Sequence, residues 1–452
     1  MTSQYKTYQK YKDSGINWVG EIPEGWEVRK IKRISNTVAG GTPLTTKLEY
    51  WDGNIPWLPS GMIHSNIIKE EDVFKYITLE GLNNSSTKKI KKNTPLIALT
   101  GATCGNVAYL TFEATANQSV VGIETNKEVN PKYIFYHLLS QREQILINKT
   151  GGAQSGINEQ NVKDIFCSYP SLSEQTAIAN FLDSKTTRIG ALIAKNKRLI
   201  ELLKEKRAAL INHAVTKGLP VRGTQTGLNP NVKMKDSGID WIGEIPEGWE
   251  VRKLKFNALV NPPGKKALSN PKTLVNFLPM EKVSENGEYG PESKAEYQDV
   301  STGYTYFEDN DVLVAKITPC FENGKGTLAN DLKFGFGFGT TEFHVIRSYD
   351  NLNPKYLFYL TKTHLFRVTG EAFMEGAAGQ KRVPTNFVKD FIMVTPPRSE
   401  QTAIANFLDK ATSKIDKTIK LIENKIALLE EYKKSLIHHT VTGKIDVRGL
   451  EY

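Results

Sequence analysis

The chain has 452 residues but few cysteines and no long apolar run. Its three cysteines, Cys104, Cys167 and Cys320, lie far apart, so they form neither a disulfide framework nor a zinc-binding pattern. The sequence lacks the roughly 18 consecutive apolar residues of a membrane-spanning helix. The N-terminal residues also lack the apolar segment of a signal peptide. These absences predict a reduced, cytoplasmic protein with no membrane partner.

Motifs that carry catalysis are scarce as well. We find no P-loop, no G-x-S-x-G elbow and no nuclease-like cluster of acidic residues and lysine, and the seven histidines are scattered. Residues 261–264 (NPPG) resemble the loop with which amino-methyltransferases hold a base, but Gly264 stands where those enzymes have an aromatic ring. Residues 334–340 (FGFGFGT) precede a strand-like segment, which favours a β-turn or bulge over a cofactor loop. The sequence therefore predicts a protein without catalytic activity or a metal site of its own.

The charge balance favours a polyanionic partner. The formal net charge is +10, and nucleic acids attract basic proteins because each neutralised phosphate releases counterions. A mildly basic surface that serves only solubility is an equally good interpretation of the charge alone.

Two segments occur twice. Residues 12–32 (KDSGINWVGEIPEGWEVRKIK) and 235–255 (KDSGIDWIGEIPEGWEVRKLK) are identical at 18 of 21 positions. The phrase SEQTAIANFLD occupies both 173–183 and 399–409. The numbering offset is 223 for the first pair (235 minus 12) and 226 for the second (399 minus 173). This period is too long for a solenoid and indicates a tandem duplication. The segments between the repeats differ, so they predict two different readers on a common frame.

Each repeat is expected to end in a long helix. Ser173 and Ser399 suit the N-caps, while Gly218 and Gly443 suit the ends. Apolar residues follow steps of four and three, the spacing of a coiled-coil seam. The seam positions are Ile189, Ile193, Ile200, Leu203 and Leu210 in the first helix, and Ile415, Ile419, Ile422, Ile426, Leu429 and Leu436 in the second. We expect the two helices to pair with each other in antiparallel fashion, although packing of each helix on its own domain remains an alternative.

Candidate DNA-binding residues lie in the segments that are expected to form loops. Lys and Arg hold phosphates, whereas Arg, Gln and Asn read base edges, although each could equally be a solvated loop residue. The candidates are Lys88, Lys89, Lys91, Lys92, Gln154, Asn158 and Gln160 in the first repeat, and Lys265, Lys266, Lys325, Gln380, Lys381 and Arg382 in the second.

The order of these phrases resembles the specificity subunit of Type I restriction–modification systems. The phrases that carry the resemblance are GEIPEGWEVRK, GGTP at 40–43, IPWLPSG at 55–61, TGAT at 100–103, AKITPCFENGKG at 315–326 and the duplicated SEQTAIANFLD. The resemblance implies an α+β fold in which two target-recognition domains, built of mixed strands, loops and short helices, are separated by two long antiparallel coiled-coil helices as a pseudo-two-fold tandem repeat. We place the first recognition domain at 1–172, the central spacer helix at 173–216, a linker at 217–234, the second recognition domain at 235–398, and the C-terminal spacer helix and tail at 399–452.

The resemblance also implies a function. Each recognition domain would read one half of a bipartite double-stranded DNA site, and two modification (methyltransferase) subunits and the restriction (translocase and nuclease) subunits would dock on this chain. The chain itself would be a non-catalytic subunit, with S-adenosylmethionine, ATP and magnesium bound by its partners. A helix of roughly 28 residues, or ~42 Å, predicts half-sites about one turn of DNA apart. The alternatives are a self-sufficient DNA methyltransferase or nuclease, and a scaffold that binds only protein.

Overall fold

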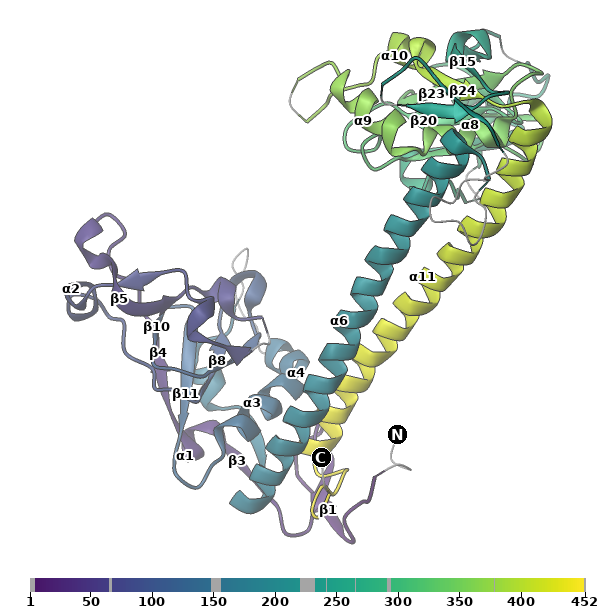
Figure 1. The fold of residues 1–452 in the computed structure, drawn as a ribbon. Coiled ribbons are helices and arrows are strands. Elements are labelled where there is room, and N and C mark those ends of the chain that lie inside the picture. The colour runs from purple at the N-terminus through teal and green to yellow at the C-terminus, as the bar shows by residue number, and fades with distance from the viewer. Residues whose placement is uncertain are drawn as a thin grey trace. The chain divides into compact units, whose positions relative to one another are not determined.

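The computed structural model describes residues 5–64, 67–147, 156–219, 232–240, 242–264, 266–290, 294–377 and 379–450. Its contacts divide the chain into two compact units (Figure 1). Unit 1 comprises Met1–Lys197 and Asn424–Tyr452, and unit 2 comprises Arg198–Glu423. Each unit contains a mixed α/β domain and a part of each of two long helices, which confirms the predicted α+β repeat.

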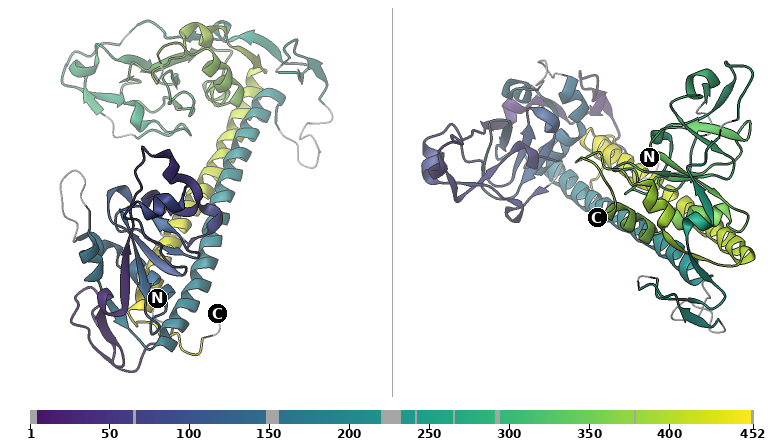
Figure 2. Two further views of the ribbon diagram at one scale, coloured as in Figure 1. Left: turned by 90° about the vertical axis from the view of Figure 1, so that its left-hand side faces the viewer. Right: turned by 90° about the horizontal axis from the view of Figure 1, so that it is seen from above.

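The two long helices are α6 (Leu172–Lys217) and α11 (Arg398–Val441). Within each unit the first part of one helix lies beside the last part of the other, so the pair is antiparallel (Figures 1 and 2). The predicted seam is the inner face of this pair. Five seam residues are buried and six are partly buried, whereas most of their neighbours on the helices are exposed; the buried ones are Ile189, Ile415, Ile419, Ile422 and Leu436.

A charged pair interrupts the seam in unit 2. Arg207 on α6 places its Nε 3.0 Å from Oδ1 of Asp416 on α11, and the two side chains are only 13% and 21% exposed. When the two SEQTAIANFLD phrases are aligned, the residue equivalent to Asp416 is Gly190 and the residue equivalent to Arg207 is Lys433. Unit 1 therefore has no such pair. Asn196 is buried too, but its amide donates to the Leu192 carbonyl one turn earlier on α6.

The helix ends follow the expectation, but both helices begin two residues earlier than N-caps at Ser173 and Ser399 would give. Gly218 and Gly443 follow the two helices with φ of +91° and +73°, a conformation that glycine adopts without strain. Ser173 and Ser399 lie inside the first turns and are not the N-caps. In α6 the hydroxyl of Ser171 instead accepts a hydrogen bond from the Glu174 amide at 3.3 Å.

Unit 1 is built on a five-stranded sheet of order β4-β11-β8-β9-β6, with a three-stranded sheet of order β10-β5-β7 and two strand pairs, β1-β2 and β3-β12. Its strands are β1 (Tyr11–Asp13), β2 (Glu21–Pro23), β3 (Glu27–Lys30), β4 (Ser35–Ala39), β5 (Trp51–Leu58), β6 (Ile67–Ile68), β7 (Tyr76–Ile77), β8 (Thr94–Ala98), β9 (Val107–Leu110), β10 (Thr115–Ala116), β11 (Val120–Thr125) and β12 (Phe166–Tyr169). Its short helices are α1 (Ile31–Ile34), α2 (Leu79–Asn83), α3 (Pro131–Ser140), α4 (Arg142–Ile147) and α5 (Glu159–Lys163).

Unit 2 contains two four-stranded sheets, of order β16-β23-β20-β21 and β18-β17-β22-β19, and the pairs β13-β14 and β15-β24. Its strands are β13 (Met234–Asp236), β14 (Glu244–Pro246), β15 (Glu250–Lys253), β16 (Ala258–Val260), β17 (Leu274–Leu278), β18 (Lys294–Glu296), β19 (Thr305–Glu308), β20 (Val312–Ala315), β21 (Gly326–Leu328), β22 (Phe336–Gly339), β23 (Phe343–Ser348) and β24 (Ile392–Thr395). Its short helices are α7 (Tyr297–Val300), α8 (Pro354–Thr361), α9 (His364–Ala372) and α10 (Thr385–Asp390).

The FGFGFG segment is a strand, so the expected turn or bulge is wrong for most of it. β22 lies between β17 and β19, and Phe336 and Phe338 point into a buried cluster. A side chain at Gly337 would come within 3.0 Å of the Asn276 carbonyl and the Phe307 ring. The alternation of phenylalanine and glycine thus fits a strand with one crowded face and one apolar face.

The repeated segments contact each other inside each unit. The indole of Trp26 donates to Glu174 at 3.3 Å, and the indole of Trp249 donates to Glu400 at 3.0 Å. Both indoles are buried, and each bond joins the opening segment of a repeat to the start of its SEQTAIANFLD helix. The two duplicated segments therefore pack against each other and form one junction, and this junction occurs once in each unit.

The end of the other long helix completes each junction. In unit 1 the Tyr133 hydroxyl donates to the carbonyls of Ser168 and, at 3.3 Å, Val441 on α11. In unit 2 the equivalent Tyr356 donates at 3.0 Å to Val394 and to Val215 on α6. The junction in each unit thus contains residues from both repeats.

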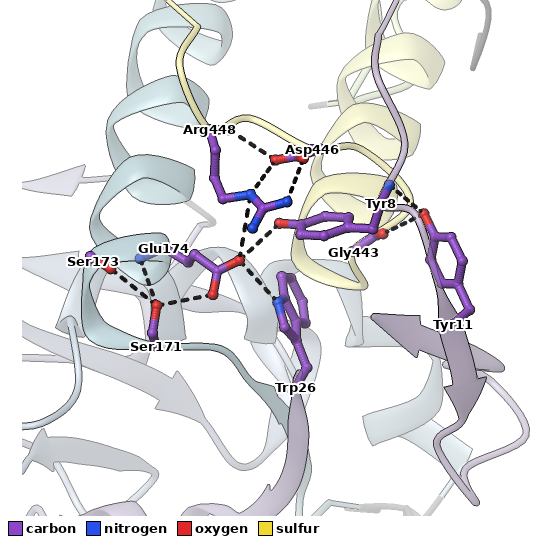
Figure 3. Close-up of polar contacts among 9 residues, drawn as sticks. All are labelled: Tyr8, Tyr11, Trp26, Ser171, Ser173, Glu174, Gly443, Asp446 and Arg448. Atoms are coloured by element: carbon purple, nitrogen blue, oxygen red, sulfur yellow. Dashed lines mark hydrogen bonds and ion pairs between the residues drawn. The ribbon is translucent and has the colours of Figure 1, made fainter. Parts of the chain in front are cut away.

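Unit 1 also brings together the first and last parts of the chain that the structure describes. Glu174 accepts hydrogen bonds from Tyr8 at 3.3 Å and from Ser171 at 2.9 Å, and lies 4.0 Å from Arg448 (Figure 3). The guanidinium of Arg448 also lies over the Tyr8 ring. Burial and the nearby Glu174 carboxylate raise the pKa of Tyr8 well above its ordinary value, so the phenol remains a donor. Within the described ranges no helix is long and apolar enough to cross a membrane.

Candidate nucleic-acid interface

The predicted lysine cluster of unit 1 lies between α2 and β8, and all four side chains are exposed. Lys89 lies 2.8 Å from Glu113, and Lys91 lies 2.7 Å from Glu124 of β11. No ion pair joins Lys88 or Lys92 to another described residue. The cluster is therefore only half neutralised, and Lys88 and Lys92 are its best candidates for phosphate contacts.

A polar groove runs beside this cluster, at the edge of the sheet where β4 and β8 begin and β11 ends. Its volume is about 390 Å³. Its lining residues include Lys91 and Lys92 of the cluster and Lys32 and Arg33 of α1. The one carboxylate among its lining residues is Glu124, which Lys91 already pairs, and Lys32 pairs with Asp164. Arg33 and Lys92 thus leave the groove with a positive balance that suits an anion.

The amide residues of unit 1 have local structural partners. Asn158 caps α5, because its side chain accepts from the Asn161 amide at 2.8 Å. Gln160 donates to Asp164 at 2.6 Å, and Lys30 and Lys32 each lie 3.0 Å from the same carboxylate. These hydrogen bonds, that from Gln160 first, hold the pKa of Asp164 well below its usual range. Gln154 lies outside the described residues, and base reading by all three amides remains a prediction.

In unit 2 most of the predicted residues gather at the end of the sheet where β16 and β20 end and β23 begins. The segment 380–382 runs beside the residues that follow β20: the Thr318 amide donates to the Lys381 carbonyl at 3.0 Å, and the Val383 amide donates to the Lys316 carbonyl at 2.8 Å. The backbone of Lys266 reaches the same region, because its amide donates to the Tyr306 hydroxyl at 3.2 Å. Lys265 lies outside the described residues.

Two of the predicted cations are already engaged. Arg382 holds the Glu342 carboxylate through Nε and Nη2, both at 2.9 Å. This pairing lowers the pKa of Glu342 and fixes the guanidinium. Lys325 points elsewhere, and its ammonium donates to the Met280 carbonyl at 3.3 Å. Lys266, Gln380 and Lys381 are exposed, and they remain the best candidates for DNA contact in this unit.

The NPPG loop lines a cleft of about 420 Å³ at this end of the sheet. The side-chain oxygen of Asn261 accepts a hydrogen bond from the backbone amide of Val345 at 3.0 Å. The backbone amide of Asn261 donates to the Val345 carbonyl at 2.7 Å. The Asn261 side chain thus completes the edge of β23, which agrees with a loop of structural character. Sequence reasoning missed Lys32, Arg33 and Lys316: Lys32 ends the repeated segment, which we assigned to the frame, Arg33 directly follows that segment, and Lys316 stands alone.

The part of the chain that the structure describes contains no group of three or more His, Cys, Asp or Glu side chains that could hold a metal ion. Two histidines are buried and act as hydrogen-bonding residues of the core. His137 bonds to Ser168 at 2.9 Å, and burial lowers its pKa to about 3. His344 bonds to the Val383 carbonyl at 2.8 Å, and burial lowers its pKa as well. Neither imidazole is presented to a ligand.

Comparison with known proteins gives a consistent result for both repeats. The family described as "Type I restriction modification DNA specificity domain" matches residues 23–202 and again residues 246–431. The EcoAI specificity subunit of a Type I restriction enzyme of Escherichia coli is 43% identical over 164 residues, which are 36% of this chain and 27% of that protein. The EcoEI subunit of the same species is 40% identical over 170 residues, 37% of this chain and 28% of that protein. These two matches thus span less than a third of each relative.

Longer matches are weaker in identity. The MjaX specificity subunit of Methanocaldococcus jannaschii, described as putative, is 24% identical over 95% of this chain and 96% of its own length. A solved structure from work on the complex assembly and conformational transition of the type I R-M system has a TM-score of 0.67 at 15% identity, covering 94% of this chain and 99% of that chain. The family match extends over more than half of the chain, once in each unit, and the chain therefore belongs to the Type I restriction–modification DNA specificity family.

Proposed function

We propose that this chain is the DNA-recognition subunit of a Type I restriction–modification complex, and that units 1 and 2 each read one half of a bipartite DNA site. The observation that carries the proposal is the repetition of one frame around two different readers. Trp26–Glu174 and Trp249–Glu400 are the same junction, whereas the sequences between the repeated segments match only at scattered positions. Two equivalent junctions that carry different recognition loops suit a site made of two different half-sequences.

The electrostatics support double-stranded DNA as the ligand. The formal net charge of +10 supplies a general attraction. In unit 1, Lys88, Lys92 and the groove lined by Lys32 and Arg33 offer phosphate contacts. In unit 2, Lys266, Gln380 and Lys381 are the exposed candidates for contacts with base edges or phosphates.

The chain acts without catalysis of its own in this proposal. The candidate cofactor loop is strand β22, and the candidate methyltransferase loop uses its asparagine to complete β23. Methylation and cleavage are assigned to modification and restriction subunits, which carry S-adenosylmethionine, ATP and magnesium.

The outer faces of the long helices support docking of two such partners. Apart from Leu172 at the first residue of α6, five leucines on α6 and α11 are 44–69% exposed: Leu192, Leu199, Leu202, Leu421 and Leu428. Leu202 and Leu428 are equivalent when the two SEQTAIANFLD phrases are aligned, so each long helix presents a leucine at the same place in its repeat. Exposed apolar groups in repeated positions indicate protein-binding surfaces, and we assign them to the two modification subunits.

The decisive experiment is a chimera tested in the assembled complex. The chain is produced with its modification subunits, and methylated adenines are mapped across a genome. Residues 256–391 are then replaced by residues 33–165, which leaves both junctions intact. We expect the wild-type complex to methylate a bipartite asymmetric site and the chimera to methylate an interrupted palindrome of the first half-site. Unchanged methylation by the chimera would refute the assignment of one half-site to each unit.

The docking assignment has its own test. Leu202→Glu combined with Leu428→Glu adds charge to exposed positions and leaves the seam untouched. We expect this variant to fold normally, as judged by circular dichroism, and to elute separately from the modification subunits in size-exclusion chromatography. A matched variant, Lys204→Glu with Lys434→Glu, changes exposed lysines of the same helices and should still elute in the complex.

A further inference from the structure

The cleft beside the NPPG loop has features that phosphate contact alone does not require. Its floor consists of Phe343 and Val345 of β23 and the ring of Tyr306, which are between 1% and 8% exposed. Pro262 and Pro263 form one wall. The remaining lining residues, Thr305, Lys316, Thr341, Asn261 and Gly264, bring hydroxyl, ammonium and amide groups.

This combination fits a flat ligand with an apolar face and a polar edge. The volume of about 420 Å³ lies in the range of small-molecule sites, which are mostly apolar with a few polar groups. A phosphate alone would find an aromatic floor unfavourable, because burial there strips its hydration. A nucleobase has the matching properties: its faces stack on aromatic or proline rings, and its edge takes hydrogen bonds from hydroxyl and ammonium groups.

The floor is held rigidly before any ligand arrives. The Tyr306 hydroxyl donates to Glu308 at 2.7 Å and accepts from the Lys266 amide at 3.2 Å, so the ring cannot rotate out of the cleft. Phe343 is fixed by its place in β23 opposite Ala315 of β20. A preformed stacking surface of this kind lowers the entropy lost on binding.

The surroundings of the cleft are those of the candidate DNA interface. Lys316 contributes to its lining, and the backbone of the next residue, Ile317, pairs with Arg382. Lys381 is held to Thr318 of the same segment by two bonds, at 3.0 and 3.2 Å. Two lysines therefore lie in the segments at the cleft, Lys316 half-buried and Lys381 exposed, as expected where a nucleotide leaves the helix stack while its phosphates stay bound.

We propose that this cleft in unit 2 receives a single unstacked base of the second half-site. The proposal rests on the DNA-reading function given above and adds a mode of reading to it. A base outside the stack presents its Watson–Crick edge, which the intact duplex hides, to Thr305, Thr341 and Lys316.

The corresponding strand end in unit 1 is crowded. There β4 ends at Ala39, and a side-chain carbon on Gly40 would lie 2.1 Å from the Asn117 carbonyl. We therefore place the unstacked base in the second half-site, and the first half-site serves as the comparison in the test.

The test uses the full chain in complex with its modification subunits and a duplex that carries the mapped site. Adenines of both half-sites are replaced one at a time by the fluorescent base 2-aminopurine, and unstacked thymines are detected by permanganate oxidation. The adenine that the complex methylates is left out of the scan. We expect one position of the second half-site to become fluorescent or reactive on binding, and no position of the first.

Thr341→Trp fills the cleft from an exposed position, and Thr341→Ser is its matched control. We expect Thr341→Trp to abolish the unstacking signal and to weaken binding of the cognate duplex about tenfold, within the range of one stacked base. Thr341→Ser should behave as wild type, and both variants should bind non-specific duplex equally.

The outcomes separate the two proposals. Sequence-specific binding with every scanned position still stacked would overturn the base pocket and leave the recognition function intact. A signal that persists in Thr341→Trp would place the unstacked base elsewhere and also overturn it. Absence of specific binding by the wild-type complex would refute the recognition function itself.

Discussion

The Arg207–Asp416 pair in the seam gives the sharpest test of the energetics. Burial raises the pKa of Asp416 although Arg207 acts to lower it, so desolvation of this carboxylate outweighs its attraction to the guanidinium. Such a pair adds little stability as a whole. Removal of Asp416, however, leaves the Arg207 charge without a partner on a side chain that is only 13% exposed. Asp416→Ala should therefore destabilise unit 2, by about 2 kcal/mol after allowance for the partial exposure.

The same reasoning fixes the controls for this variant. Arg207→Met combined with Asp416→Leu removes both charges and should recover most of the lost stability. Glu201→Ala breaks the Arg198–Glu201 pair, which has a similar distance of 2.9 Å but side chains 60% and 62% exposed. Exposed pairs contribute little, so this variant should change stability by less than about 0.5 kcal/mol.

Hydrogen exchange measured by mass spectrometry on the full chain resolves the effect by region. A loss of about 2 kcal/mol corresponds to exchange about 30-fold faster, since each 1.4 kcal/mol is a factor of ten. The acceleration should affect residues 200–215 and 408–423, whereas peptides of unit 1 should exchange as in the wild type. Equal effects of Asp416→Ala and Glu201→Ala, or a double variant as unstable as Asp416→Ala, would refute the account of a buried, poorly compensated pair.

Three further predictions follow from the frame and the loops. A fragment of residues 1–217 exposes its seam and should form a concentration-dependent dimer in light scattering, and a strictly monomeric fragment at high concentration would show that the seam does not drive pairing. Alanine at Lys88 and Lys92 should weaken binding to all DNA sequences and flatten its salt dependence more than alanine at the ion-paired Lys89 and Lys91, a contrast that salt titrations of affinity would detect. Burial lowers the pKa of Lys362 to about 7, and its ammonium donates to the carbonyls of Glu285, Gly324 and Gly326 at 3.0, 2.7 and 2.9 Å. Between pH 7 and 10 the unfolded chain then binds more protons than the folded one, so the free energy of unfolding should rise with pH in this window. In thermal unfolding, Lys362→Leu should lose this rise and be less stable than the wild type at pH 7. An unchanged pH profile would contradict the assignment.

Local spacing decided what the sequence could predict. The seam is a property of one helix at a time, so the steps of four and three identified all eleven positions before a partner was known. The strand FGFG was missed because its environment is non-local: Phe307 and Asn276 explain its glycines, and they belong to β19 and β17, two strands from earlier parts of the chain. Lys89 and Lys91 were indistinguishable from Lys88 and Lys92 for the same reason, since Glu113 and Glu124 come from other segments. The cleft required four separate segments to meet, and of these only the NPPG loop drew attention in the sequence.

The division of the chain also has a consequence for its synthesis on the ribosome. Unit 2 is continuous, from Arg198 to Glu423, whereas unit 1 needs residues from Asn424 onward. Its core includes Leu436, Ile437 and Val441 of α11. At ~5–20 residues per second, these residues emerge roughly 10–50 s after the first part of unit 1 is complete. During that interval the nascent first reader lacks one wall of its core, while the second reader can finish folding. The domain translated first is thus the last to mature, and neighbouring ribosomes on one messenger present incomplete chains that can bind each other or a partner subunit.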